Sequence, residues 1–400
     1  MHKVLVLTST FPRWENDTEP PFVFELCKQL AESFDVYVLT PHAPGALHNE
    51  ILNKIKVFRF RYFFESHETL CYQGGMLARL KENAWRYLLI PFFMLSQLIA
   101  AYRLIKHENI YLIHAHWIIP QGLIACILRL FFRHPIRVLC TSHGGDLFSL
   151  TGNVANLIKR LVLINSQAVS VVNSVMVKKV YSICKPFNPI VSVIPMGVDF
   201  ENKFLPSLVA KKPFSLIVVG RLVEKKGIHY LIYALPLVLK IFPQVHLSII
   251  GNGPMHGELN ELVDQLQLRY CVNFLGLVSN DELPIHYQAH QIAVFPFIVA
   301  ENGDRDGLPV VIPEAVGCGC CIVTTDLPGV EDVITHEHNG LMVKQKSSLS
   351  IAEAIIELFS NPDKINQYSL IAYDEVLAKF DSKIVGNKYT VLIESMLESA

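Results

Sequence analysis

Short apolar runs rich in β-branched residues alternate along the chain with segments in which apolar residues recur at helical spacing. The runs VLVLTS, DVYVLTP, YLIHAH, RVLCTS and AVSVVNS have the length of buried strands, and a helix is expected over residues 23–33. This alternation is typical of βαβ units on a parallel sheet with both faces covered.

The alternation is interrupted once, by ENKFLPSLVAKKP at residues 201–213, and resumes with SLIVVG, HLSIIG, NFLG, IAVFPF and CCIVTT. We therefore predict an α/β protein of two tandem Rossmann-like, doubly wound domains, residues 1–200 and residues 201–385. Open α/β sheets bind ligands at the carboxyl ends of their strands, so the active site is expected in a cleft across which the domains face each other.

Composition excludes several classes of protein. With 51% hydrophobic and 18% charged residues among 400, the chain is too apolar to be disordered and long enough for two cores. A net charge of -1 excludes a generally basic nucleic-acid binder. Residues 1–200 hold 20 basic and 13 acidic side chains, whereas residues 201–400 hold 15 and 23. The electropositive first half suits an anionic acceptor or an anionic membrane face.

Cysteines and apolar segments bear on the compartment. The nine cysteines are odd in number and irregularly spaced, which favours a reducing compartment over a disulfide framework. The apolar run at residues 4–7 is too short for a secretory signal. The longest apolar stretch, residues 87–102, is broken by Pro91 and is shorter than the roughly 20 residues that span a bilayer. These features predict a cytoplasmic protein without a transmembrane helix.

The segment GRLVEKKG, residues 220–227, follows the first strand of the second domain. Glycine permits a tight turn there, and Arg221 and Lys226 place two cations where an open sheet receives anionic ligands, which favours a phosphate or diphosphate. A solvated basic turn partnered by Glu224 would explain the same residues. The next strand end, GNGP with Gly253, is a second glycine-rich turn.

The segment ENGDRDGLPVVIPEAVGCG, residues 301–319, joins a strand to a helix. With Pro309 at the first helical position, the backbone N–H groups of Gly307 and Leu308 would face an anion such as a diphosphate. Pro313 lies inside this expected helix and indicates a later start, because an internal proline removes a ladder donor.

Two carboxylates of the same segment, Asp306 and Glu314, are acceptors suited to gripping hydroxyls at two points of a sugar nucleotide. The alternative is that Asp306, its acidic neighbours and Arg305 form an ordinary charged surface loop. Spacing alone leaves both interpretations open.

In the first domain RVLCTS runs into HGGD, so His143 stands at a strand end before two glycines and Asp146. A neutral imidazole there can exchange hydrogen bonds with a substrate hydroxyl. The preceding strand ends in HAHW, where His114 and His116 could bind a metal, but no carboxylate or cysteine lies close in sequence and packing is favoured. The CGCC run at residues 318–321 is likewise interpreted as buried thiols, so no metal site is predicted.

The loop TSTFPRWENDTEPPFV after the first strand is long for a βα connection and contains Arg13. Long structured loops at strand ends are often functional, so Arg13 is an acceptor-binding candidate together with His116 and Asp146. Basic and aromatic side chains interleave over residues 79–133. This pattern fits either docking on anionic lipid or a core helix with polar edges.

Taken in order, the segments FPRWENDTEPPFV, HAHWIIPQG, TSHGGDL, IPMGVD, GRLVEKKG, IIGNGP and DGLPVVIPEAVGCG resemble the motifs of family 4 retaining glycosyltransferases (glycosyltransferase group 1), which have the glycosyltransferase B fold. The resemblance spans nearly the whole chain. It implies transfer of a sugar from a nucleotide-diphosphate-sugar to a glycan or lipid-linked acceptor, with retained anomeric configuration and no cofactor or tightly bound metal. It further implies a part in cell-surface polysaccharide synthesis, a peripheral place on the inner face of the cytoplasmic membrane, and packing of residues 386–400 on the first domain.

The resemblance also implies roles for individual residues. Arg221 and Lys226 match the pair that neutralises the donor diphosphate, and His143 matches the histidine that contacts the donor sugar. Glu314 matches the glutamate on the ribose hydroxyls. Asp306 stands where the family has a first glutamate and is one methylene shorter. The full set of expected donor-binding residues is Glu314, Gly307, Leu308, Pro309 and Gly253.

Other interpretations stay open beside this one. A phosphorylase or sugar-nucleotide epimerase on the same fold would depend on orthophosphate or convert the donor without an acceptor. A non-catalytic nucleotide-sugar-binding subunit is suggested by Asp306 and by the absence of a glycine pair at residues 19–21. An NAD-linked oxidoreductase is poorly supported, because TSTFPRW and not a G-x-G-x-x-G turn follows the first strand.

Overall fold

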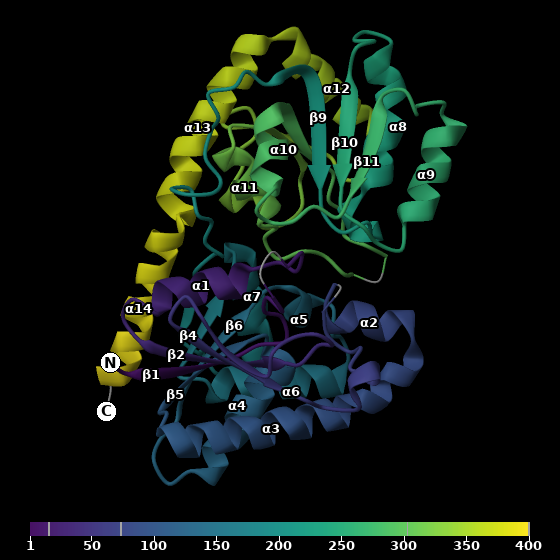
Figure 1. Ribbon diagram of the computed structural model, residues 1–400. Helices are drawn as coiled ribbons and strands as arrows, with labels where there is room; N and C mark the ends of the chain where they lie inside the picture. The colour runs from purple at the N-terminus through teal and green to yellow at the C-terminus, as the bar shows by residue number, and fades with distance from the viewer. Residues whose placement is uncertain (15–16, 73, 302, 399–400) are drawn as a thin grey trace. The chain divides into compact units, whose positions relative to one another are not determined.

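The computed structural model describes residues 1–14, 17–72, 74–301 and 303–398, and it divides into two compact units (Figure 1). The first unit begins at Met1, ends at Gly197 and takes in the chain again from Ser382, and the second is Val198–Asp381. The sequence placed these boundaries at 200/201 and 385/386. Each unit has its own parallel sheet, and the predicted α/β class with two such domains is confirmed.

The first unit is built on an eight-stranded sheet in the order β3-β4-β2-β1-β5-β6-β7-β8. Its strands are β1 (Lys3–Leu7), β2 (Asp35–Pro41), β3 (Asn49–Leu52), β4 (Ile55–Phe60), β5 (Leu112–His116), β6 (Arg137–Ser142), β7 (Ala168–Val171) and β8 (Val191–Val193). All neighbours are parallel except β3, which is antiparallel to β4. The order reverses between β1 and β5, so the carboxyl ends of these strands form the switch point where ligands of such sheets bind.

Helices cover both faces of this sheet. They are α1 (Phe22–Leu30), α2 (Met76–Glu82), α3 (Leu89–Glu108), α4 (Leu123–Leu128), α5 (Gly145–Phe148), α6 (Asn153–Asn165), α7 (Ser174–Cys184) and α14 (Ser382–Glu398). On one face, Phe93 and Ile105 of α3 pack with Ile113 of β5 in a single buried cluster. The C-terminal helix α14 lies against α1 (Figure 1), and its buried Tyr389 hydroxyl is 3.2 Å from Ser170 Oγ on β7.

The second unit is built on a six-stranded, fully parallel sheet in the order β11-β10-β9-β12-β13-β14. Its strands are β9 (Lys212–Val219), β10 (His246–Ile250), β11 (Val272–Gly276), β12 (His290–Phe295), β13 (Cys321–Thr325) and β14 (Leu341–Val343). The order reverses between β9 and β12. The carboxyl ends of these two strands are therefore the ligand-binding edge of this sheet.

Successive residues of β9 face opposite sides, which divides the core of the second unit into two layers. Leu216 and Val218 pack in one cluster with α8 (Ile228–Leu239), α9 (His256–Gln265) and α12 (Ser348–Ser360). Ile217 and Val219 pack in the other with α10 (Leu283–Ala289), α11 (Val311–Gly317) and α13 (Pro362–Phe380). Strands buried on both faces are mainly apolar, and this explains why their sequences show no regular alternation of polar and apolar residues.

The apolar helix of the first unit is longer than the stretch identified from sequence. Among the described residues, helical structure over Ala84–Glu108 extends for 25 residues and is apolar enough, by length and composition, to cross a membrane. The prediction ended this stretch at residue 102 and counted Pro91 as a break. Pro91 is the third residue of α3, where the backbone N–H has no intrahelical partner, and the helix continues beyond Tyr102 through Arg103 and Lys106.

Candidate active site

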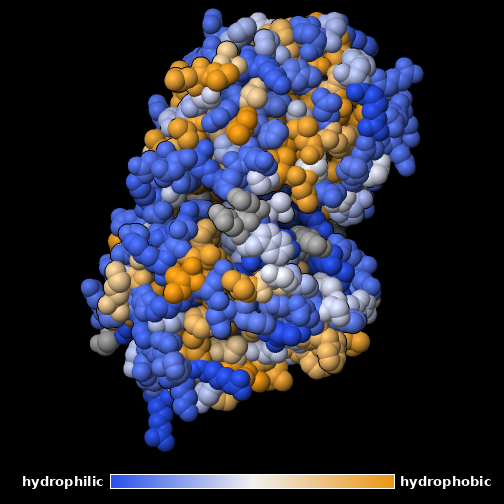
Figure 2. All heavy atoms as spheres, viewed as in Figure 1, coloured by the Kyte–Doolittle hydropathy of each residue, from blue (hydrophilic) through white to orange (hydrophobic). Residues whose placement is uncertain are grey.

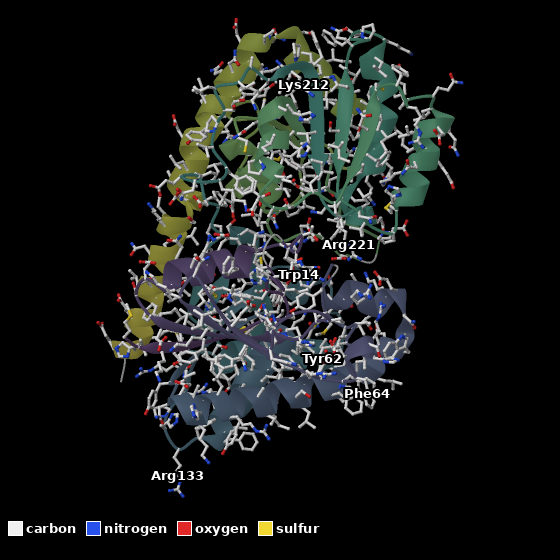
Figure 3. All side chains as sticks on the ribbon, viewed as in Figure 1. Trp14, Tyr62, Phe64, Arg133, Lys212 and Arg221 are labelled. Atoms are coloured by element: carbon white, nitrogen blue, oxygen red, sulfur yellow. The ribbon has the colours of Figure 1, made fainter. Side chains whose placement is uncertain are left out.

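The loops after β9 and β12 meet at the switch point of the second sheet. Figure 3 labels Lys212 and Arg221 near the two ends of β9, and Arg221 stands at the carboxyl end. The loop that begins with Arg221 is tied to the neighbouring strand end, because Leu222 N–H donates to the Asn252 carbonyl at 3.0 Å. The two basic residues identified from sequence are thus placed where this fold binds its ligand.

Lys226 and Asp306 are brought together across 80 residues of sequence. Lys226 Nζ lies 2.7 Å from Asp306 Oδ2 and 4.7 Å from the centre of the Phe297 ring. Lys225 binds the other carboxylate oxygen, with Nζ 3.1 Å from Asp306 Oδ1, and also lies 3.3 Å from Asp304 Oδ1. The result is a compact cluster of two lysines and two aspartates at the carboxyl ends of β9 and β12.

The electrostatics of this cluster follow from its burial. Burial by itself would raise the pKa of Asp306, but Lys225 and Lys226 hold it below its ordinary value, so the carboxylate is ionised at neutral pH. Burial by itself would lower the pKa of Lys225, but the charges of Asp306 and, to a smaller extent, Asp304 raise it above its ordinary value. Lys225 was not singled out from sequence, and the signal available was only its place beside Lys226.

Gly227 allows the Lys226 loop to approach the β12 loop. It has φ of 63°, in the left-handed region, and a Cβ at this position would lie 1.9 Å from the Pro296 carbonyl oxygen. The two loops are joined next to it by the Ile298 N–H, which donates to the Lys225 carbonyl at 2.9 Å. A side chain at 227 would therefore push the two halves of the site apart.

Gly227→Ala is expected to destabilise the protein by about 1–3 kcal/mol and to weaken nucleotide-sugar binding, because strain and overlap both act at this position. Thermal denaturation and ligand titration measure the two effects. Gly257→Ala is the matched control: Gly257 lies in α9 of the same unit and a Cβ there meets nothing within 4 Å. Equal effects of the two substitutions would contradict the importance of this close approach.

The expected helix start is wrong by two residues. α11 begins at Val311, so Pro309 precedes the helix and does not occupy its first position. Pro313 is the third helical residue, where no backbone donor is lost. Gly307 and Leu308 lie in the loop that precedes the helix.

Glu314 lies in the first turn of α11. Burial raises the pKa of Glu314 to about 7, against smaller opposing effects of Lys203 and Lys226. A carboxyl group with this pKa is present in both protonation states near neutral pH.

Gly253 supports the β9 loop through its backbone. Its N–H donates to the Asn252 side chain at 2.7 Å, and a Cβ would lie 2.4 Å from the Leu222 carbonyl oxygen. The structure thus places Gly253 directly against the residue that follows Arg221.

In the first unit the structure brings together two of the predicted histidines. His116 Nδ1 at the end of β5 lies 3.0 Å from His143 Nε2 after β6, and the rings are stacked with centroids 5.2 Å apart. The rings of Trp117 and Phe22 pack on the His143 ring, with centroid distances of 4.9 and 5.0 Å. Burial lowers the pKa of His143 to about 3, and burial together with His114 and His143 lowers that of His116, so both rings are neutral at physiological pH.

Both oxygens of the Asp146 carboxylate accept hydrogen bonds from groups of the protein itself. It is buried and accepts hydrogen bonds from Ile118 N–H at 2.7 Å and Ser142 Oγ at 2.8 Å. It therefore joins the loops after β5 and β6, which carry His116 and His143. This gives Asp146 a role in positioning those loops, and its contact with an acceptor stays a prediction.

Arg13 is also held by a partner within its own loop. Its guanidinium forms two hydrogen bonds to buried Asp17, at 2.8 and 2.6 Å, and lies 4.4 Å from the Trp14 ring and 5.2 Å from the Tyr72 ring. Trp14 itself is exposed and is labelled in Figure 3. The predicted loop FPRWENDTEPPFV includes residues 15–16, which lie outside the described residues.

His116→Phe is expected to lower turnover about tenfold, because it keeps an aromatic ring but removes the hydrogen bond that fixes the tautomer of His143. His116→Asn, which retains a polar group, should recover part of the loss. Turnover and KM measured separately, with unfolding temperatures, distinguish positioning from a folding defect. Wild-type turnover in a folded His116→Phe variant would contradict this role.

The possible metal ligands do not assemble in the part of the chain that the structure describes. There, no group of three or more His, Cys, Asp or Glu side chains could hold a metal ion. The cysteines are free, and eight of the nine, among them Cys318, Cys320 and Cys321, are buried. Their thiols therefore serve packing, as at the junction of α11 and β13.

Solved structures with the same architecture define the fold. Sucrose-phosphate synthase from Thermosynechococcus elongatus superimposes with a TM-score of 0.80 at 18% identity over 100% of both chains. HepE from Anabaena, solved with UDP-glucose, gives 0.75 at 16% identity over 99% of this chain and 100% of that one. The chain has the glycosyltransferase B fold.

Family models match both units. Residues 21–202 match Glycosyltransferase Family 4, and residues 199–374 match Glycosyl transferases group 1. The chain belongs to glycosyltransferase family 4, as the motif resemblance indicated.

Two of the curated relatives match over shorter segments. An uncharacterised glycosyltransferase of Methanocaldococcus jannaschii is 32% identical over 45% of this chain and 46% of its own length. The GDP-mannose-dependent α-(1-6)-phosphatidylinositol monomannoside mannosyltransferase of Mycobacterium tuberculosis is 28% identical over 57% of this chain and 62% of its own length. The matched part of the chain thus spans about half the length of these relatives.

Proposed function

We propose that the protein is a retaining glycosyltransferase that moves a sugar from a nucleotide-diphosphate-sugar to a glycan or lipid-linked acceptor in cell-surface polysaccharide synthesis. The observation that carries this proposal is the cluster of Lys226, Lys225 and Asp306 beside Arg221, at the switch point of the second sheet. Cations held at this place in the fold suit a diphosphate. The UDP-glucose in HepE and the lipid-linked mannosyl acceptor named for the mycobacterial relative support a donor and an acceptor of these classes.

In the proposed reaction Lys226 and Arg221 stabilise the negative charge that develops on the departing diphosphate. When donor binds, Lys226 moves its contact from Asp306 to a phosphate oxygen. Lys225 continues to balance the negative charge of Asp306, whose carboxylate then accepts hydrogen bonds from donor-sugar hydroxyls. Ionised Glu314 accepts hydrogen bonds from the ribose hydroxyls. Neutral His143 exchanges a hydrogen bond with the donor sugar, and the departing diphosphate oxygen takes the acceptor proton as the new glycosidic bond forms on the same face.

We further propose that turnover needs no tightly bound metal and takes place in the cytoplasm at the membrane face. Lys226 and Arg221 supply the positive charge that a divalent cation would otherwise bring to the diphosphate. The 20 basic against 13 acidic side chains over residues 1–200 suit an anionic membrane or an anionic acceptor.

Release of nucleoside diphosphate tests the proposal. Purified protein is incubated with UDP-, GDP-, ADP- and CMP-sugars and a bacterial lipid-linked glycan extract, with and without EDTA. We expect release that requires the acceptor and withstands EDTA, and a product with the anomeric configuration of the donor by ¹H NMR. Release that requires orthophosphate, or donor conversion without an acceptor, would identify a phosphorylase or an epimerase instead.

A further inference from the structure

The outward face of α3 carries a stripe of exposed apolar side chains. Leu88, just before the helix, and Phe92, Leu95 and Ile99 within it are all exposed, and their spacing of three to four residues places them on one side. Figure 2 shows hydrophobic side chains along the lower edge of the first unit, where Figure 1 draws α3. Exposed apolar rows of this length are uncommon on a soluble monomer.

Neighbouring segments extend the stripe at both ends. Near its start, the Phe63 ring lies 5.3 Å from that of Phe92, and the adjacent Phe64 is exposed. Near its end, the Phe131 ring lies 6.4 Å from that of Tyr102 on α3. We call the whole the α3 surface, and its exposed apolar members are Leu88, Phe92, Leu95, Ile99, Phe64, Leu130 and Phe131.

The rim of the α3 surface is cationic. Arg103 and Lys106 are exposed near the end of α3, and exposed Arg133 follows Phe131 and Phe132 and points away from the body of the unit in Figure 3. Residues 83–145 contain a single acidic residue, Glu108, whose carboxylate is bound by Lys3 at 3.0 Å, and Glu65, beside Phe64, lies 3.9 Å from Arg61. An apolar stripe with a basic rim has the composition of a segment that lies on an anionic lipid interface.

We infer that the α3 surface docks on an anionic lipid leaflet, with α3 lying in the plane of the interface. This deepens the membrane location in the proposed function and rests on it. The apolar side chains enter the acyl boundary while Arg103, Lys106 and Arg133 contact lipid phosphates.

The buried side of α3 argues against a spanning helix. Phe93, Ala101 and Ile105 are fully buried in the core of the first unit, and Gln97 is fully buried beside them. A helix crossing the bilayer would withdraw these side chains from the sheet. Binding of a second copy of the chain to the α3 surface is also disfavoured, because a symmetric dimer through this face would bring two basic rims together.

Vesicle flotation tests the inference. The full chain is mixed with vesicles of phosphatidylcholine and phosphatidylglycerol at about 0.1 M salt, and the bound fraction is measured. We expect wild-type protein to bind, binding to weaken on pure phosphatidylcholine, and Leu95→Glu/Ile99→Glu to reduce affinity at least tenfold. Leu157→Glu on α6 is the matched control, because Leu157 and Leu95 are both 56% exposed, and it should bind within about twofold of wild type.

Three outcomes would overturn the inference. They are failure of the wild-type protein to bind anionic vesicles, unchanged vesicle affinity in Leu95→Glu/Ile99→Glu, and an equal loss of vesicle affinity in Leu157→Glu. Resistance to alkaline extraction from membranes would establish a spanning helix, and a lipid-free dimer broken by the double substitution would establish a second copy as the occupant. Donor-induced thermal stabilisation, measured without vesicles, should be the same in the double variant as in wild type. Vesicle binding by a protein that binds no nucleotide-sugar would refute the proposed function and leave the α3 surface supported.

Discussion

Replacing Lys226 by alanine is expected to lower turnover at least tenfold in a folded protein. Lys226 Nζ stands at the switch point of the second sheet, 2.7 Å from Asp306 Oδ2, and is proposed to transfer this contact to the donor diphosphate. A preorganised charge on a leaving group contributes about 3 kcal/mol to the barrier. Arg221→Ala is expected to act in the same direction. Single-turnover rates with saturating donor measure the effect directly.

Lys225→Ala is the matched control for this experiment. Lys225 is the neighbouring residue and holds the same Asp306 carboxylate, at 3.1 Å. If Lys226 acts on the diphosphate, its removal lowers turnover far more than removal of Lys225, while unfolding temperatures fall by similar amounts. Equal turnover losses would show that both lysines act only by neutralising Asp306, and wild-type rates in Lys226→Ala and Arg221→Ala would refute the proposed role.

Replacing Glu314 by glutamine is expected to change stability and donor affinity in opposite directions. Because burial raises the pKa of Glu314 to about 7, the folded state holds a proton that the unfolded chain releases at its ordinary pKa of 4.5. That contribution to stability is complete below pH 4.5 and is lost as pH rises through 7. Glutamine does not ionise, so Glu314→Gln should be more stable than wild type by about 1–3 kcal/mol at pH 8 and little different at pH 4.5.

Donor affinity should fall about tenfold in the same variant, because a charged acceptor for the ribose hydroxyls is replaced by a neutral one. Denaturant titrations at the two pH values and a nucleotide-sugar titration at pH 8 measure both changes. Glu353→Gln, at an exposed position of α12, is the control and should alter neither. A stability gain independent of pH, or unchanged donor affinity, would contradict the account of Glu314.

Strands buried on both faces were predictable because the composition of the strand itself marks where it lies in the sequence. β5 and β13 are buried at every position, and each appears in the sequence as a short, mainly apolar or β-branched run between helical segments. The antiparallel pair β3–β4 was missed, since β3 is an edge strand with exposed Asn49 and Ile51 and shows no continuous apolar run. The start of α11 was misplaced because Pro309 is favourable both at a first helical position and just before it.

The candidate site was partly predictable for the same reason. Strand ends located Arg221, Lys226 and His143, because the fold places strand ends at the ligand edge. The pairing of Lys225 with Asp306 and of His116 with His143 depends on which strands become neighbours in the sheet. That information is distributed over long stretches of chain and has no local signature.

The central claim is that the second unit holds a nucleotide-sugar through Lys226, and ligand-induced thermal stabilisation tests it most directly. Wild-type protein, Lys226→Ala and Lys225→Ala are each heated with UDP-, GDP-, ADP- and CMP-sugars, since a ligand that binds the native state raises the unfolding temperature. The account predicts a clear rise with the sugars of one base, a greatly reduced rise in Lys226→Ala, and a largely retained rise in Lys225→Ala. No rise with any nucleotide-sugar at millimolar concentration, or an undiminished rise in Lys226→Ala, would contradict it.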